Sequence, residues 1–256
     1  MTARSPRRVL VVGSTGRLGV AIARALVGRG DRVLITGRDE TKLEALADEL
    51  EALAAERDAA TGSPSTAAAP SAGARPTVIA KNLLLDDAPS VIADAARRSG
   101  EVTDVVLACG PFPRTPIEQL ARGDLELTLR VHAIAPLLLV NDLSAELGRH
   151  QGAVVALTDG GVSRPYPNHV AYLTAKGALQ AGLRALAVEH GPHVRLNVVA
   201  LGIVADPEAD ADPLRTHRVA SRSPLGRMGT PSEVVHAVLS LLDATWATGE
   251  IWGIGR

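Results

Sequence analysis

The sequence predicts one α/β domain built on an open, parallel β-sheet with helices on both faces. Its length of 256 residues suits such a sheet, because α/β domains routinely reach this size undivided. Short β-rich runs alternate with longer helical patterns along the chain. The short runs are apolar nearly throughout, as parallel strands buried on both faces should be.

Six short apolar runs are predicted as strands, and they cover 8–13, 32–36, 77–80, 104–108, 153–158 and 194–200. The helical patterns cover 18–28, 40–57, 88–98, 117–147, 170–189 and 231–242. Right-handed crossovers then give the Rossmann arrangement, a doubly wound parallel sheet of about seven strands. Residues 61–76 lack large apolar side chains, so we expect a flexible loop there within a single domain over 1–256.

Charge and composition argue against several classes of partner. The formal net charge of −1 leaves no electrostatic footprint for nucleic acid or an anionic membrane. No apolar run is long enough to span a bilayer, and the N-terminal residues lead into a strand rather than a signal-peptide core. The single cysteine rules out an internal disulfide. We therefore expect a cytoplasmic protein with a small-molecule partner and no metal.

A glycine-rich loop, V-V-G-S-T-G-R-L-G at residues 11–19, joins the first strand to the first helix. Glycine permits a tight turn and close approach of a pyrophosphate, while the helix N-terminus supplies N–H groups and a favourable dipole. A purely structural turn is the alternative, but the position after the first strand of a βαβ unit favours nucleotide binding. The candidate cofactor-binding residues of this loop are Gly13, Ser14, Thr15, Gly16, Arg17, Leu18 and Gly19.

The end of the second strand indicates which dinucleotide binds. Thr36, Gly37 and Arg38 offer no carboxylate for a ribose 2′-hydroxyl, whereas Arg38 is suited to a 2′-phosphate. Arg17 could add a second positive charge. The sequence therefore favours NADP(H), with NAD(H) as the alternative because arginines are also common at solvated surfaces.

Tyr172 and Lys176 form a Y-x-x-x-K pattern on a predicted helix that follows Asp159. Side chains four residues apart share a helix face, so the ammonium can lie near the phenol and lower its pKa. A surface tyrosine and lysine would give the same pattern. The chain has only two tyrosines and three lysines, however, and the pair closely follows a predicted strand. Tyr172 is therefore the candidate general acid.

The order of these motifs resembles the short-chain dehydrogenase/reductase family over almost the whole chain. The resemblance rests on the glycine loop, the Y-x-x-x-K pair, R-L-N-V-V-A-L-G at 195–202, P-L-G-R-M-G-T-P-S-E at 224–233 and T-G at 248–249. It implies NAD(P)(H)-dependent oxidoreduction, with Lys176 on the nicotinamide ribose. It also implies a substrate lid at 205–223 and a homodimer or homotetramer. The further cofactor-binding residues that it implies are Asn82, Leu83, Ala108, Gly110, Gly202 and Val204.

Several departures from the common family pattern resemble the pteridine reductases and dihydromonapterin reductases. They are Arg17 in the glycine loop, Asp159 in place of serine, and H-A-I-A-P at 132–136. The segment P-F-P-R-T-P at 111–116 matches the place where pteridine reductases hold a phenylalanine over the bound pterin. Phe112 is the only phenylalanine of the chain, and it is either a stacking platform or a packed loop anchor.

The chemistry of these residues sets the expected reaction. Hydride addition to C=O or C=N leaves negative charge on the heteroatom, and Tyr172 can donate the proton that neutralises it. An ionised Asp159 would repel that charge, so either it is protonated or the substrate is not a simple ketone. A carboxylate beside the acceptor favours a heterocycle that carries N–H donors. The alternative role for Asp159 is a cap on the turn that follows it.

We therefore expect an NADPH-dependent reductase of a small planar nitrogen heterocycle, pterin-like or purine-like, with Phe112, Asp159 and Tyr172 at the substrate. His132 replaces an asparagine that many family members use near a proton relay, and it serves either that relay or simple helix packing. Two other functions stay open. One is a general carbonyl reductase or alcohol dehydrogenase, and the other is a cofactor-sensing regulator that has lost catalysis.

Overall fold

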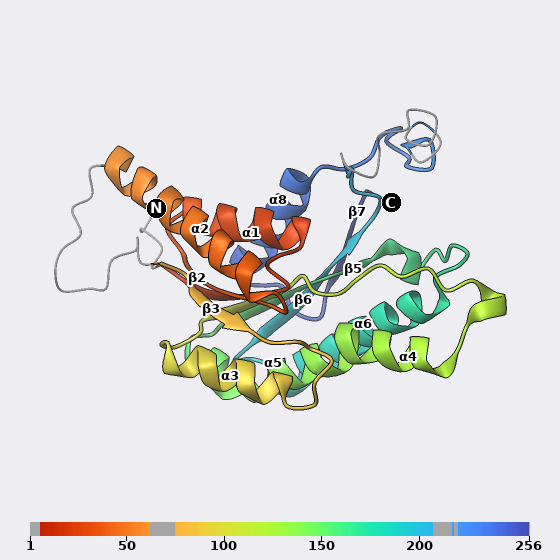
Figure 1. The fold of residues 1–256 in the computed structure, drawn as a ribbon, viewed down its shortest axis with the longest axis horizontal. Coiled ribbons are helices and arrows are strands. Elements are labelled where there is room, and N and C mark those ends of the chain that lie inside the picture. Colours follow the sequence, from red (N-terminus) through yellow and green to blue (C-terminus); the bar gives the residue numbers. More distant parts are fainter. Residues whose placement is uncertain (1–5, 62–74, 207–216, 218–219, 256) are drawn as a thin grey trace.

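The computed structural model describes residues 6–61, 75–206, 217 and 220–255 of the chain (Figure 1). Its centre is one sheet of seven parallel strands in the order β3-β2-β1-β4-β5-β6-β7. The strands are β1 (Arg8–Val12), β2 (Arg32–Gly37), β3 (Thr77–Ala80), β4 (Asp104–Leu107), β5 (Ala153–Asp159), β6 (Arg195–Leu201) and β7 (Ile251–Ile254). The strand order reverses between β1 and β4, and ligands of such sheets bind outside the carboxyl ends of the strands at this point.

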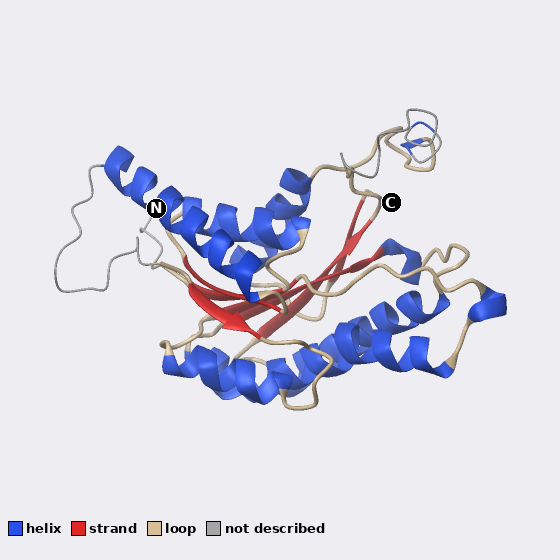
Figure 2. Ribbon diagram, viewed as in Figure 1, coloured by secondary structure: helices blue, strands red, loops and turns tan. Residues whose placement is uncertain are grey.

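Helices cover both faces of the sheet, so the molecule has three layers (Figure 2). One face carries α1 (Arg17–Gly28), α2 (Glu40–Thr61) and α8 (Pro231–Asp243), and the other carries α3 (Ala88–Arg98), α4 (Arg122–Leu129), α5 (Ala135–Arg149) and α6 (Val170–His190). Alternate side chains of each strand enter opposite cores. In β1, Leu10 and Val12 pack on the α3, α5 and α6 side, whereas Val9 and Val11 pack on the α1, α2 and α8 side.

The predicted fold class is confirmed, because the six predicted strands and β7 form one doubly wound Rossmann sheet. The helix expected over 117–147 is instead divided into a 3-10 turn, η1 (Ile117–Gln119), then α4, a π-helical segment, η2 (Arg130–Ile134), and α5. Pro136 in the first turn of α5 explains the irregularity, since proline has no N–H to donate to the carbonyl of His132. The α-helical hydrogen-bond ladder is therefore interrupted at His132.

Two predicted segments fall mainly outside the described residues. The loop expected at 61–76 is described only at 61 and 75–76, and the lid expected at 205–223 only at 205–206, 217 and 220–223. Both remain predictions. Within the described part of the chain, no helix combines the length and apolar character that a membrane span requires.

Candidate active site

Asp159, Tyr172 and Lys176 lie together at the carboxyl end of β5. Asp159 is the last residue of that strand, and the other two project from the first two turns of α6, which packs beside it. The Tyr172 hydroxyl donates to Oδ2 of Asp159 at 3.3 Å, and the Lys176 ammonium donates to the Leu157 carbonyl at 3.0 Å. Tyr172 and Lys176 are both buried. The structure thus brings these three of the four predicted catalytic side chains into one cluster, and the ring of the fourth, His132, lies 5.3 Å from the Tyr172 ring between centroids.

The carboxylate of Asp159 accepts hydrogen bonds from three donors. Its Oδ1 accepts from the Gly161 N–H at 2.6 Å, and its Oδ2 accepts from the hydroxyls of Tyr166 and Tyr172 at 2.9 and 3.3 Å. Asp159 therefore caps the turn and contacts the predicted proton donor at the same time, so its two interpretations are compatible. The hydroxyls of both tyrosines of the chain therefore donate to the same carboxylate oxygen.

Tyr166 and His169 belong to this site, although no sequence motif indicates them. Tyr166 lies in the loop between β5 and α6, and its ring covers Gly161, where an added Cβ would lie 2.3 Å from Tyr166 Cε1. His169 precedes α6, and its Nδ1 hydrogen-bonds with the Pro113 carbonyl at 2.8 Å. The rarity of tyrosine was the one available signal. The contact of Tyr166 with Asp159 could not be predicted, because it depends on how the loop turns back.

Burial and the nearby carboxylate together set the pKa of the predicted proton donor. The pKa of Tyr172 lies above its ordinary value, because burial disfavours the phenolate and because Asp159 opposes it through charge and hydrogen bonding. The expected lowering by Lys176 is not found. Its ammonium lies 5.8 Å from the ring centroid of Tyr172 and donates to a backbone carbonyl instead. Burial first and Asp159 second also raise the pKa of Tyr166.

An aromatic cluster stands beside these residues. The Phe112 ring stacks on His169, with centroids 4.2 Å apart and planes at 13°, and meets the Tyr172 ring edge-on at 4.8 Å. Phe112 nevertheless remains 58% exposed. The ring is therefore anchored by His169 and still offers surface on which a planar molecule can stack.

His132 is buried against the loop that carries Phe112. Its Nε2 hydrogen-bonds with the Pro111 carbonyl at 2.9 Å, which requires a proton on Nε2. Burial, helped by the positive charge of Lys176, lowers the pKa of His132 to about 3. The ring is therefore neutral at any ordinary working pH. These contacts favour a packing and loop-positioning role over proton transfer by the imidazole.

A cavity of about 400 Å³ opens at the carboxyl ends of β1 and β2, beside the segments that follow β3 and β4. Gly13 has a φ of +84°, and an added Cβ would lie 2.6 Å from the Cys109 Cα, so this position requires glycine. Gly19 is a packing position, because an added Cβ would lie 2.3 Å from the Gly13 carbonyl oxygen. The predicted cofactor residues that line the cavity are Gly13, Thr15, Gly16, Arg38, Asn82, Leu83, Ala108 and Gly110.

Positive charge gathers in this cavity. Arg38, Lys42 and Lys81 all line it, and the two lysines were not predicted. The Lys42 ammonium lies 3.8 Å from Asp39, which also lines the cavity, and the Lys81 ammonium donates to Asp87 at 2.8 Å. With Lys176 at the catalytic cluster, every lysine of the chain lies at the candidate site. The three cations fit an anionic group such as a phosphate.

Other predicted cofactor residues lie outside this cavity. Ser14 is fully buried, its hydroxyl donates to the Val11 carbonyl at 2.6 Å, and its N–H donates to the Thr36 carbonyl at 3.0 Å, so it ties the glycine loop to β2 and does not line the cavity. Arg17 begins α1 and reaches the Val204 carbonyl at 3.5 Å, while Leu18 packs against the α1 side core. Gly202 and Val204 line a second cavity.

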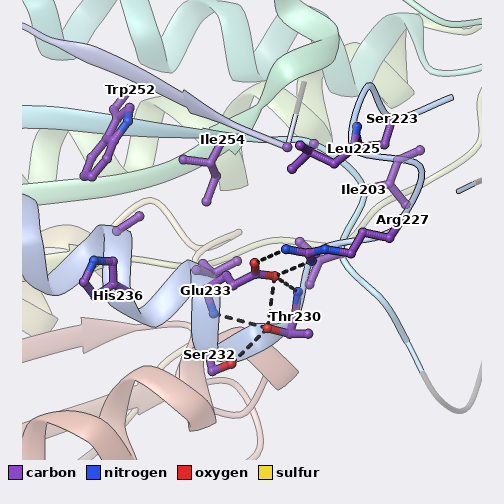
Figure 3. A pocket seen from close by; sticks show the side chains of 16 residues that line it. Ile203, Ser223, Leu225, Arg227, Thr230, Ser232, Glu233, His236, Trp252 and Ile254 are labelled. Carbon is purple, nitrogen blue, oxygen red and sulfur yellow. Dashed lines mark hydrogen bonds and ion pairs between the residues drawn. The ribbon is translucent and has the colours of Figure 1, made fainter.

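The second cavity, about 470 Å³, lies between α8, β7 and the segment after β6 (Figure 3). Polar groups that line it are already paired with one another. Arg227 pairs with Glu233 at 2.6 Å, and Glu233 also accepts from the Thr230 N–H at 2.8 Å. The structure therefore separates Gly202 and Val204 from the cavity at the glycine loop.

The comparison with protein families decides the assignment. The family model described as enoyl-(acyl carrier protein) reductase matches residues 84–254, which include Asp159, Tyr172 and Lys176. The chain belongs to the short-chain dehydrogenase/reductase family. This short-chain dehydrogenase/reductase is accordingly an NAD(P)(H)-dependent oxidoreductase, as the sequence predicted.

Individual relatives of this reductase differ in what they act on. Glucose 1-dehydrogenase of Gluconobacter oxydans (strain 621H) is 26% identical over 95% of this chain and 88% of its own length. L-sorbose reductase of Gluconobacter frateurii, solved with NADPH and L-sorbose, has a TM-score of 0.84 and 19% identity, covering 98% of this chain and 95% of that chain. FolM alternative dihydrofolate reductase 1 of Brucella canis, solved with NADP, has a TM-score of 0.79 and 24% identity, covering 96% of this chain and 91% of that chain. The two structures show the fold alone, and the pteridine reductase subtype is left unconfirmed.

Proposed function

We propose that the protein is an NADPH-dependent reductase of C=O or C=N in a small planar nitrogen heterocycle, pterin-like or purine-like. The observation that carries this proposal is the carboxylate of Asp159, which accepts from the Tyr172 hydroxyl at 3.3 Å. A carboxylate at that place opposes the oxyanion of a simple ketone, whereas it can accept an N–H of a heterocycle. The proposed substrate therefore presents a hydrogen-bond donor next to its reducible bond.

The roles of the side chains follow from their contacts. When bound, NADPH supplies the hydride to the carbon of the double bond. Tyr172 donates its hydroxyl proton to the heteroatom, and Asp159 holds a ring N–H and so orients the heterocycle. Phe112 lies beside Tyr172 with its ring supported by His169, and its exposed surface supports the plane of the substrate.

The cavity at the glycine loop supports NADPH rather than NADH. Arg38, Lys42 and Lys81 line it, and such charge favours the 2′-phosphate, which NADPH carries and NADH lacks. Asp39 lies among them, but it is engaged as an acceptor for the Lys42 N–H at 3.1 Å at the start of α2. A carboxylate used in this way is less available to a ribose 2′-hydroxyl.

The second candidate function is a carbonyl reductase or dehydrogenase of sugars. It is favoured by the names of relatives, since glucose 1-dehydrogenase and L-sorbose reductase both resemble this chain over nearly its full length. Oxidation of NADPH and NADH with pterins, purine analogues, sugars and simple ketones separates the candidates. Turnover of heterocycles with NADPH supports the proposal. Turnover of sugars or ketones alone contradicts it, as does tight cofactor binding without turnover of any of them.

We also propose a homodimer or homotetramer. Leu127, Ile134 and Leu138 are 55, 50 and 48% exposed, and Ile134 and Leu138 lie four residues apart and so share one helical face. A second copy of the chain would cover this apolar stripe. Ile134 has no part in the proposed chemistry, so Ile134→Glu should reduce the mass measured by sedimentation equilibrium without changing the fold. An unchanged mass would place the interface elsewhere.

A further inference from the structure

Tyr166 stands out among residues that the proposed reaction does not use. Its hydroxyl donates to Asp159 Oδ2 at 2.9 Å, which is within the usual range for an O–H···O bond. The Tyr172 hydroxyl donates to the same oxygen at 3.3 Å, which is longer than that range. The carboxylate is therefore held mainly by Tyr166 and by the Gly161 N–H, and only weakly by the proton donor.

This division of contacts matters because a phenol has one proton. While Tyr172 donates to Asp159 it cannot donate to a reactant, so the hydroxyl must leave the carboxylate at each turnover. A carboxylate that loses its donor in a half-buried site is costly, and the cost would hold Tyr172 in place. Tyr166 removes this obstacle, since Asp159 keeps two donors after Tyr172 has turned away.

We propose that Tyr166 is a positioning residue that keeps the Asp159 carboxylate satisfied and so frees the Tyr172 hydroxyl for proton donation. The inference rests on the proposed function only in that Tyr172 is the proton donor. It applies to whichever substrate class the wild-type enzyme reduces. The ring of Tyr166 is fixed for this role by Gly161 beneath it and by His169, whose ring centroid lies 5.2 Å away.

Tyr166→Phe is the direct test, because it removes the hydroxyl and keeps the ring that packs on Gly161 and His169. We expect kcat to fall about tenfold while KM changes less than about twofold, since the lost contact acts on proton donation and not on substrate binding. In the oxidative direction Tyr172 must lose its proton. In Tyr166→Phe, Tyr172 carries the only phenol that donates to the carboxylate, so Asp159 should raise the pKa of Tyr172 further. The pH at which the oxidation rate rises should therefore shift upward.

A double-mutant cycle with Asp159→Asn shows whether Tyr166 acts through Asp159. We expect Tyr166→Phe to lower kcat much less in the Asp159→Asn enzyme than in the wild type, and chemical unfolding of the four proteins to show the same coupling. An unchanged kcat and pH profile in Tyr166→Phe would overturn the inference, as would equal losses in both backgrounds. A wild-type enzyme that is inactive on every substrate would count against the proposed function, and the unfolding cycle would then decide whether the two side chains are coupled at all.

Discussion

Replacing Asp159 with asparagine is the sharpest test of the proposed chemistry. The change keeps the size of the side chain and removes its charge, and the amide oxygen can still accept from the Gly161 N–H, now 2.6 Å from Oδ1. We therefore expect a loss of stability of about 2 kcal/mol, because the two tyrosine hydroxyls that donate to Oδ2 must rearrange and one altered hydrogen bond usually costs about 1 kcal/mol. Cofactor affinity should stay within about twofold, because Asp159 is not among the residues that line the cavity at the glycine loop.

Turnover of a heterocycle should respond much more strongly. Loss of a charged acceptor from the ring N–H should lower kcat/KM about 100-fold, which corresponds to roughly 2.7 kcal/mol of transition-state stabilisation. For a simple ketone we expect the opposite change in kcat/KM when Asp159 is replaced by serine. Asp159→Ser supplies a neutral hydroxyl that can donate to an oxyanion, so ketone reduction should rise while heterocycle reduction falls.

The assay is NADPH oxidation by wild type, Asp159→Asn and Asp159→Ser with one heterocycle and one ketone, alongside NADPH binding measured by fluorescence. The removal of charge should also let the pKa of Tyr172 fall, because Asp159 helps to raise it after burial. Oxidation of the reduced product should then extend to lower pH in Asp159→Asn. Wild-type heterocycle turnover in both variants would remove Asp159 from the mechanism, and a large loss of NADPH affinity would mean that it acts through the cofactor.

Three further outcomes are expected. Arg38→Ala should weaken NADPH binding about tenfold and NADH binding little, and equal loss for both would contradict a 2′-phosphate contact. Phe112→Leu should raise KM for planar substrates several-fold, with Val188→Ala as a control at an exposed residue near the far end of α6, and an unchanged KM would leave Phe112 as a loop anchor. The pKa of His132 lies at about 3 in the folded protein and near 6.5 when unfolded, so the unfolded chain binds more protons between these values. Stability should therefore fall by up to about 4 kcal/mol as the pH drops through that window, and His132→Asn should flatten this dependence in urea unfolding measured at several pH values.

The sequence predicted the sheet well because its strands carry a strong local signal. Short apolar runs such as 104–108 and 153–158 are typical of parallel strands that are buried on both faces. The three layers therefore follow from the pattern itself. The interruption at Arg130–Ile134 was not predicted, because helical periodicity continues through it. Pro136 was the available signal, since it removes one N–H from the ladder.

The site was predicted in part for a similar reason. Spacing along α6 brings Tyr172 and Lys176 onto neighbouring turns, and the end of β5 fixes Asp159 beside them. Spacing does not reveal which neighbouring group has the larger effect on the pKa of the Tyr172 phenol. The ammonium of Lys176 is satisfied by the Leu157 carbonyl, and this contact depends on the exact depth at which the helix packs on the sheet. The loop that returns Tyr166 to the same carboxylate likewise has no periodic pattern.

Gly110 and His132 show how the cofactor side and the substrate side of the site are joined. Gly110 has a φ of +108°, and an added Cβ would lie 2.0 Å from His132 Cε1, so the imidazole occupies the space that any other residue would need. The same imidazole holds the Pro111 carbonyl, directly before Phe112. A smaller side chain at 132 would release both constraints at once. The histidine therefore fixes the path of the loop from the cavity at the glycine loop to the Phe112 ring, and it does so without a charge because its burial keeps it neutral.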